Sequence, residues 1–223
     1  MIDYTLTRSK RKTVIIYVRS SGVDIRAPLR MPMHEIDRFV ASKEKWIKSR
    51  LVRTQEQAVQ RENFNLDYGD MILYRGKLYP IAQKAGNRAV FVDETFYVPP
   101  GLSPDEIKAA CVKIYKKLAK LDINEKVQYF AGRLSVKPTA VKINSAKTRW
   151  GSCSAKKSLN FSWRLIMADD DVIDYVVVHE LAHIIELNHS NRFWSIVEGI
   201  LPDYKENQKR LKELQRKLLS ENW

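Results

Sequence analysis

The stretch from residue 169 to 189, DDDVIDYVVVHELAHIIELNH, constrains the fold more than any other part of the sequence. Its apolar residues lie on most sides of the helix that their spacing predicts, so this helix should run through the interior of a domain. The same helix also carries His179, Glu180 and His183. Burying two imidazoles and a carboxylate is costly unless they have partners. The sequence therefore predicts a central helix with a polar site on one side.

Three of the four histidines in this 223-residue chain lie within that stretch. Residues four apart on a helix share a face and lie about 6 Å from each other, so His179 and His183 can direct ring nitrogens at one ion. Glu180 lies about 100° further round the helix, where its carboxylate can reach a metal-bound water without binding the metal. This spacing is typical of zinc hydrolases in which the glutamate is the general base. The alternative is three core or surface histidines on an ordinary helix.

A third histidine ligand requires the helix to end. If the helix continued, His189 would lie about 9 Å along the axis from His183, too far for a shared ion. Asn188 most readily adopts the left-handed conformation that ends a helix, and a turn there would bring His189 back toward the pair. Glu186 would lie about 10 Å along the axis from His179, so we interpret it as an outer or solvent-facing carboxylate.

The predicted metal ligands are therefore His179, His183 and His189. We expect one Zn²⁺ per chain, although imidazole ligands also suit manganese, iron or nickel.

Other residues are candidates for supporting roles. Tyr204 and Arg192 are the nearest downstream side chains that could stabilise transition-state charge, but they are also interpretable as a packed ring and a surface residue. Cys153 could offer a thiolate to the metal, yet a structural role is the simpler interpretation. Cys111 is the only other cysteine and no CxxC pair occurs, so the sequence argues against a disulfide scaffold or a cysteine zinc cluster and favours a reducing compartment.

Composition limits the partners and the compartment. The formal net charge of +13 favours anionic partners such as nucleic acid, nucleotides or acidic peptides. No window approaches the ~20 apolar residues of a membrane span, and the N-terminus lacks a secretory pattern. We therefore expect a cytoplasmic protein that does not bind membranes, with an oligomeric state that the sequence leaves open.

The first hundred residues are predicted to be β-rich with one long helix. Residues 13–19 and 23–28 read as a hairpin, and residues 31–57 as the helix. Residues 71–83, which turn at a glycine, and residues 88–100 then read as further strands.

The remainder, residues 101–223, is predicted to be mainly helical. Ser103 and Glu106 form a predicted capping box for a helix that extends to about Phe130. The segments TAVKINS and SLNFSWRL alternate like two strands of a hairpin around GSCSAKK. The central helix follows, then two shorter helices that begin with NRFW and DYKE. The predicted fold class is therefore α+β, with a domain boundary predicted near residue 100.

Several motifs resemble the YgjP-like family of metal-dependent hydrolases, which are relatives of the SprT-like zincin proteases. They are TRWGSCS, LNFSWRLIMA and DYVVVHELAHIIELNHSNRFWSIVEGILPDYK, with a weaker resemblance in RSKRKTVIIYVRSSGVDIRAP and KEKWIKSRL. The resemblance implies a zincin-like metallohydrolase domain at residues 101–223, with zinc on His179, His183 and His189 and with Glu180 as catalytic base. The sequence departs from metzincins, which carry a glycine at the position of Glu186 and a downstream methionine turn. It also departs from gluzincins, whose third ligand is a glutamate on a later helix.

Three functions remain open from the sequence. The first is a zinc metallopeptidase, in which the SLNFSW strand could pair with an extended peptide beside the metal. The second is a metal-dependent hydrolase of nucleotides or phosphate esters, similar to a pyrophosphatase, since the same chemistry attacks phosphorus. The third is a nucleic-acid-associated protease or binding module like the SprT relatives, in which basic and aromatic residues contact phosphates. A strand edge open to peptide would favour the first, and a closed pocket lined by Lys and Arg the second.

Overall fold

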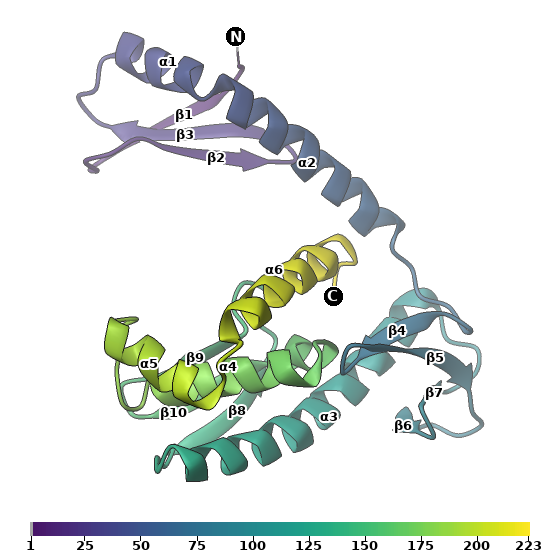
Figure 1. Cartoon of the computed structure of the whole chain (residues 1–223). Helices are drawn as coiled ribbons and strands as arrows, with labels where there is room; N and C mark the ends of the chain where they lie inside the picture. Colours follow the sequence, from purple (N-terminus) through teal and green to yellow (C-terminus); the bar gives the residue numbers. More distant parts are fainter. Residues whose placement is uncertain (1) are drawn as a thin grey trace. The chain divides into compact units, whose positions relative to one another are not determined.

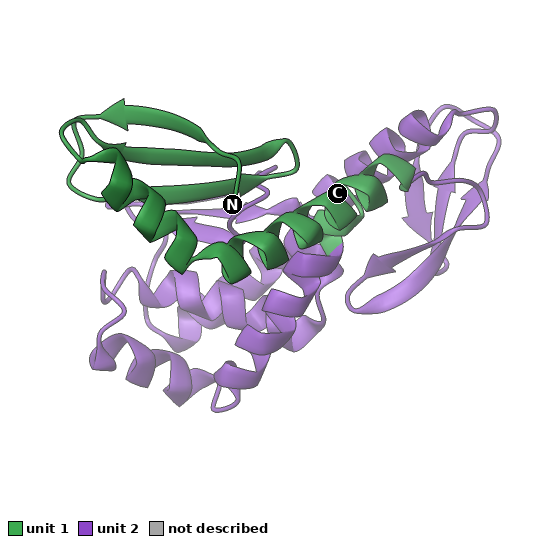
Figure 2. Cartoon of the chain, turned by 90° about the horizontal axis from the view of Figure 1, so that it is seen from above, with its two compact units in different colours: residues 1–64, 218–222 green, residues 65–217, 223 purple. Residues whose placement is uncertain are grey.

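The computed structural model describes residues 2–223, which form two compact units (Figures 1 and 2). Unit 1 contains residues 2–64 together with the short segment 218–222. Unit 2 contains residues 65–217 and Trp223. These units reflect contacts within the chain and do not test the functional boundary predicted near residue 100, which stays a prediction.

Unit 1 is a three-stranded sheet packed against two helices. Strands β1 (Thr5–Ser9), β2 (Ile15–Arg19) and β3 (Gly22–Pro28) lie in the order β1-β3-β2. The predicted hairpin is confirmed as the antiparallel pair β2 and β3, and β1 adds a parallel strand that the sequence analysis missed. Helices α1 (Met33–Ser42) and α2 (Glu44–Asn63) follow.

The helix predicted over residues 31–57 is divided into α1 and the longer α2. Lys43 interrupts it with backbone angles of φ −108° and ψ 8°, and its N–H bonds to the carbonyl of Val40 in a tight turn. The break has a packing reason. It lets Ile36 and Val40 of α1 and Ile47 of α2 pack in one hydrophobic core with residues of β3. All three side chains are fully or nearly fully buried.

Unit 2 begins with a four-stranded sheet that confirms the predicted strands. Its strands are β4 (Met71–Tyr74), β5 (Lys77–Gln83), β6 (Val90–Val92) and β7 (Thr95–Val98), in the order β4-β5-β7-β6. The β4–β5 hairpin turns at Gly76, which has a φ of +75°. A Cβ atom at Gly76 would lie only 1.9 Å from the Asp169 carboxylate, so glycine is needed here both for the turn and for a close approach.

Helix α3 (Pro104–Arg133) is the long helix that the capping box predicted. The Ser103 N–H donates to the Glu106 carboxylate over 2.9 Å, which satisfies a backbone donor at the helix start. Tyr115 lies in the middle of the buried face, where its ring stacks on Trp163 and its hydroxyl donates to the carbonyl of Leu73 over 2.6 Å. This residue joins α3 to the first sheet of unit 2.

The second sheet of unit 2 corrects the predicted hairpin. Its strands β8 (Ala140–Asn144), β9 (Gly151–Cys153) and β10 (Ser158–Ser162) lie in the order β8-β10-β9. The two segments predicted as hairpin arms, β8 and β10, are parallel neighbours, and the antiparallel hairpin joins β9 to β10. Apolar alternation is the same in parallel and antiparallel strands, so the pattern alone did not distinguish them.

The central helix follows a short 3₁₀ helix, η1 (Trp163–Met167), and is α4 (Asp170–Ala182). Its acidic first turn is as predicted, and it has specific partners. Arg75 donates two hydrogen bonds to Asp170, at 2.8 and 2.7 Å, and Lys126 contacts Asp174 over 2.6 Å. Helices α5 (Asn191–Ile200) and α6 (Tyr204–Ser220) complete the α+β fold.

No helix formed by residues 2–223 combines the length and the apolar character needed to cross a membrane.

We predict that Tyr115→Phe lowers the free energy of unfolding by about 1–2 kcal/mol, because the partly buried carbonyl of Leu73 loses its donor while the ring stays in place. Denaturant titration measures the change. Tyr129→Phe on the same helix is the matched control, since Tyr129 is 61% exposed and should leave the stability unchanged. Equal stability of the two variants would contradict the importance assigned to the Tyr115 hydrogen bond.

Candidate metal centre

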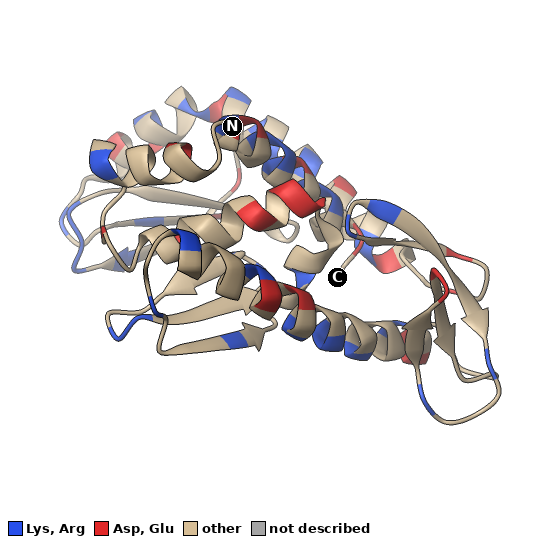
Figure 3. Cartoon of the chain, turned by 60° about the horizontal axis from the view of Figure 1, so that its bottom comes forward, with Lys and Arg blue, Asp and Glu red and all other residues tan. Residues whose placement is uncertain are grey.

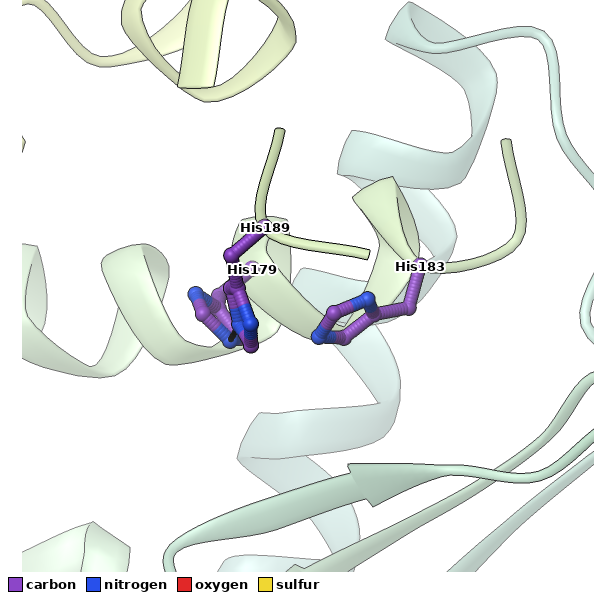
Figure 4. A group of neighbouring side chains, drawn as sticks. All are labelled: His179, His183 and His189. Atoms are coloured by element: carbon purple, nitrogen blue, oxygen red, sulfur yellow. Dashed lines mark hydrogen bonds between the residues drawn. The ribbon is translucent and has the colours of Figure 1, made fainter. Parts of the chain in front are cut away.

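Three histidines converge at the C-terminal end of α4 (Figure 4). One ring nitrogen from each of His179, His183 and His189 lies within 4.8 Å of those of the other two. The Nε2 atoms of His179 and His189 are 3.1 Å apart. Two nitrogens bound to one tetrahedral zinc at 2.0–2.1 Å would lie about 3.3–3.4 Å apart. The cluster therefore fits a single ion with small ring movements.

Burial keeps two imidazoles of this cluster in their neutral form. Desolvation, with the nearby rings of His183 and His189, lowers the pKa of His179 to about 3. Desolvation also lowers the pKa of His183. Both imidazoles are therefore neutral near pH 7, and neutral imidazole is the form that binds metals. His189 is exposed, so the site opens to solvent on its side.

The chain reaches His189 by ending the helix earlier than predicted. Helix α4 stops at Ala182, and the following N–H groups close tight turns onto the last helical carbonyls, including Glu186 N–H to Ala182 O over 2.9 Å. The prediction that Asn188 ends the helix in a left-handed conformation is wrong, since Asn188 is not among the residues with positive φ. The turns from His183 onward already satisfy the terminal carbonyls, which leaves no such role for Asn188.

The second nitrogens of two histidines have partners that determine which nitrogen remains for a metal. His183 Nδ1 lies 3.2 Å from the backbone carbonyl of Glu186, which can only accept, so this nitrogen carries the proton and Nε2 is free. His179 Nδ1 lies 3.4 Å from the Tyr175 hydroxyl. Gln208 of α6 donates to that hydroxyl over 3.0 Å. Partners of this kind orient metal-binding histidines.

Glu180 is buried beside the cluster. Its side chain is 6% exposed, and burial raises its pKa to about 7. Strand β9 approaches it closely: a Cβ atom at Gly151 would lie 2.6 Å from both Cγ and Oε1 of Glu180. A carboxyl with a pKa near 7 can both take up and release a proton at neutral pH.

The two proposed stabilisers of transition-state charge differ in their surroundings. Tyr204 is 6% exposed and its ring stacks between Tyr175 and Trp194. Arg192 lies in the first turn of α5 with a 74% exposed side chain, and its Nε is 4.0 Å from the Glu186 carboxylate. Their catalytic roles stay predictions.

Glu186 and Cys153 lie close to the site without joining the histidine group. Glu186 contributes its backbone carbonyl to His183, while its carboxylate faces Arg192. Cys153 is half-buried in β9, where burial and the charge of Glu180 raise the pKa of its thiol. Its sulfur is not among the ligand atoms that lie within 4.8 Å of one another, which supports the structural interpretation of Cys153.

Sequence reasoning missed the aromatic and amide groups around the histidines. His189 stacks on Trp194 with ring centroids 5.6 Å apart, and Phe193 contacts all three histidine rings. The contact of Tyr175 with His179 could have been predicted from the sequence, because Tyr175 lies four residues before His179 on the same helix face. The contact of Gln208 with Tyr175 could not have been predicted in this way, because it joins segments that are far apart in the sequence.

Comparison with known protein families matches residues 12–214 to the YgjP-like metallopeptidase domain. The chain belongs to the YgjP-like family. The resemblance expected from the sequence motifs is thereby confirmed over most of the chain, and membership of a metallopeptidase family makes the protein a metal-dependent peptidase by class.

Solved structures of two archaeal proteins are similar to part of this YgjP-like chain. The metallopeptidase zymogen abylysin of Pyrococcus abyssi is 25% identical, with a TM-score of 0.40, and the match covers 42% of this chain and 96% of abylysin. The metallopeptidase zymogen jannalysin of Methanocaldococcus jannaschii is 21% identical, with a TM-score of 0.38, over 41% of this chain and 94% of jannalysin. No curated protein matches the chain.

We predict that Gly151→Ala displaces the Glu180 carboxylate and lowers peptidase activity about 10–100-fold while metal content is unchanged, because the added methyl group meets Glu180 first. Hydrolysis of casein and elemental analysis of the same preparation provide the two readouts. Gly199→Ala is the matched control, since a Cβ atom there meets nothing within 4 Å. Full activity of Gly151→Ala would argue against a role for the position of Glu180.

Proposed function

We propose that this protein is a zinc-dependent peptidase in which His179, His183 and His189 hold the metal and Glu180 is the general base. One observation carries the proposal: three imidazole nitrogens lie within 4.8 Å of one another at the end of a buried helix. Three nitrogen ligands leave a fourth position of a tetrahedral zinc open, as catalytic rather than structural sites require.

The roles of the chain's own groups follow from their surroundings. A bound zinc supplies Lewis acidity and lowers the pKa of water at neutral pH. Glu180 takes the proton of the attacking water on a carboxylate oxygen and returns it to the leaving amine, for which a pKa near 7 is suited. The contacts of His183 with the Glu186 carbonyl and of His179 with Tyr175 keep both rings oriented.

The edge of the second sheet supports peptide rather than phosphate chemistry. The SLNFSW segment, predicted to pair with peptide, forms β10, which is the central strand of its sheet and has both edges occupied. Strand β9 is one of the two edge strands of this sheet, and its Gly151 approaches Glu180. We infer that an extended substrate pairs with β9, which would place its backbone next to the proposed general base.

Hydrolysis of nucleotides or phosphate esters is the alternative. The side chains in contact with the histidine rings are aromatic, and the neighbouring cation, Arg192, is largely exposed. A pocket for a polyphosphate is expected to present several Lys or Arg groups. This arrangement favours the peptidase.

We expect about one zinc per chain in the wild-type protein, loss of that zinc in His183→Ala, and retention of it in Glu180→Gln. Glu180→Gln should lower kcat/KM for peptides about 10²–10⁴-fold, because the amide cannot accept the proton. Elemental analysis and assays on casein and nucleoside triphosphates test both points. A metal-loaded Glu180→Gln protein with full activity would rule out the general base, and preferential hydrolysis of triphosphates would select the phosphate alternative.

We further predict that Tyr175→Phe weakens zinc binding about 10–100-fold by removing the hydroxyl next to His179 Nδ1 while keeping the stacked ring. Competition with a chromophoric chelator measures the dissociation constant. Thermal unfolding of the metal-free protein is the control for packing and should change little. Unchanged zinc affinity would mean that Tyr175 only fills space.

A further inference from the structure

Strand β2 of unit 1 is an edge strand. It pairs with β3 on one side, and no other strand within residues 2–223 pairs with its second side. The N–H and C=O groups on the free side of an edge strand are a template for another extended chain. β2 is only five residues long, and Ile16, Tyr17 and Val18 at its centre are half-buried. Its free edge is therefore short but framed by apolar side chains.

An apolar groove lies beside this edge. A cavity of about 350 Å³ is lined by Ile16 of β2, Phe39 of α1, Lys43 at the helix break, and Trp46 of α2. Trp46 is 52% exposed, which is unusual for the largest apolar side chain. Since side chains alternate along a strand, a chain added to β2 would direct every second side chain toward the helices and into this groove.

One cation, Lys43, lines the groove, and unit 1 as a whole is basic. Residues 2–64 contain fourteen Lys and Arg but only seven Asp and Glu, so a large part of the +13 charge lies in this short unit. Arg50 and Arg53 follow Trp46 by four and seven residues, on the same face of α2. Lys43, Arg50 and Arg53 form no ion pair with any residue in the described part of the chain. Lys and Arg recur along the helices and strands (Figure 3).

We propose that the free edge of β2 and the groove of Phe39, Lys43 and Trp46 bind an extended acidic segment of a partner polypeptide. The segment adds a strand to β2, places an apolar side chain against Trp46, and pairs its carboxylates with Lys43 and Arg50. A polypeptide is favoured over nucleic acid because only a peptide backbone matches the row of N–H and C=O groups on a strand edge. The site lies within unit 1 and does not depend on the metal centre.

Fluorescence anisotropy of the full chain tests this site. The probe is a fluorescein-labelled ten-residue peptide in which Glu alternates with Leu and Phe. Trp46→Ala and Lys43→Glu should each raise its dissociation constant about 5–10-fold, through lost apolar contact and reversed charge respectively. Lys45→Glu is the matched control, since it makes the same change of charge on a different face of α2. N-methylation of alternate peptide N–H groups should abolish binding.

Three outcomes would overturn the proposal. Equal effects of Lys43→Glu and Lys45→Glu on the dissociation constant would show that the peptide binds only through non-specific electrostatic attraction. Loss of peptide binding when the metal is removed with a chelator would assign the probe to the metal centre. Tighter binding of a labelled ten-residue oligothymidylate, weakened by Trp46→Ala, would assign the groove to single-stranded nucleic acid. The intact mass of the peptide after each titration confirms that it has not been cleaved.

Discussion

The burial of α4 is the constraint on which the rest of unit 2 depends. Nine of its thirteen side chains are buried, and Glu180 is the only carboxylate among them. A helix that is apolar on nearly every side needs cover in all directions, which α3, α5 and the β9 edge provide. The same neighbours exclude water from Glu180 and His179. This desolvation raises the pKa of Glu180 and lowers the pKa of His179, so that the neutral form of each is favoured. Packing and the chemistry of the site therefore have one physical cause.

The opposite end of α4 is held by charge. Arg75 from the β4–β5 turn and Lys126 from α3 bind the carboxylates of Asp170 and Asp174, while Arg210 from α6 pairs with Asp169 over 2.5 Å. Cations from three elements thus meet at the acidic first turn, where the carboxylates also favour the positive end of the helix dipole. With its start fixed and its sides packed, the helix presents the histidines at its other end in a defined position.

The sequence predicted the features that depend on neighbours along the chain. The histidine cluster could be predicted because two of the proposed ligands share a helix face and the third follows within six residues. The capping box at Ser103 could be predicted for the same reason. The break at Lys43, the parallel pairing of β8 with β10 and the early end of α4 at Ala182 were not, because packing between distant segments determines them. The contacts of Gly151 with Glu180 and of Gln208 with Tyr175 also join distant parts of the sequence.

The short span of the histidine cluster has a consequence for folding. Joining His179 to His189 closes a loop of about ten residues, so the chain loses little conformational entropy when the three rings come together. A metal held there would link the end of α4 to the residues just before α5 without requiring the distant strands to be in place. The three predicted ligands therefore come from one short segment of the chain, whereas the strand edge proposed to align a substrate is β9, which packs against α4 from a different part of the sequence.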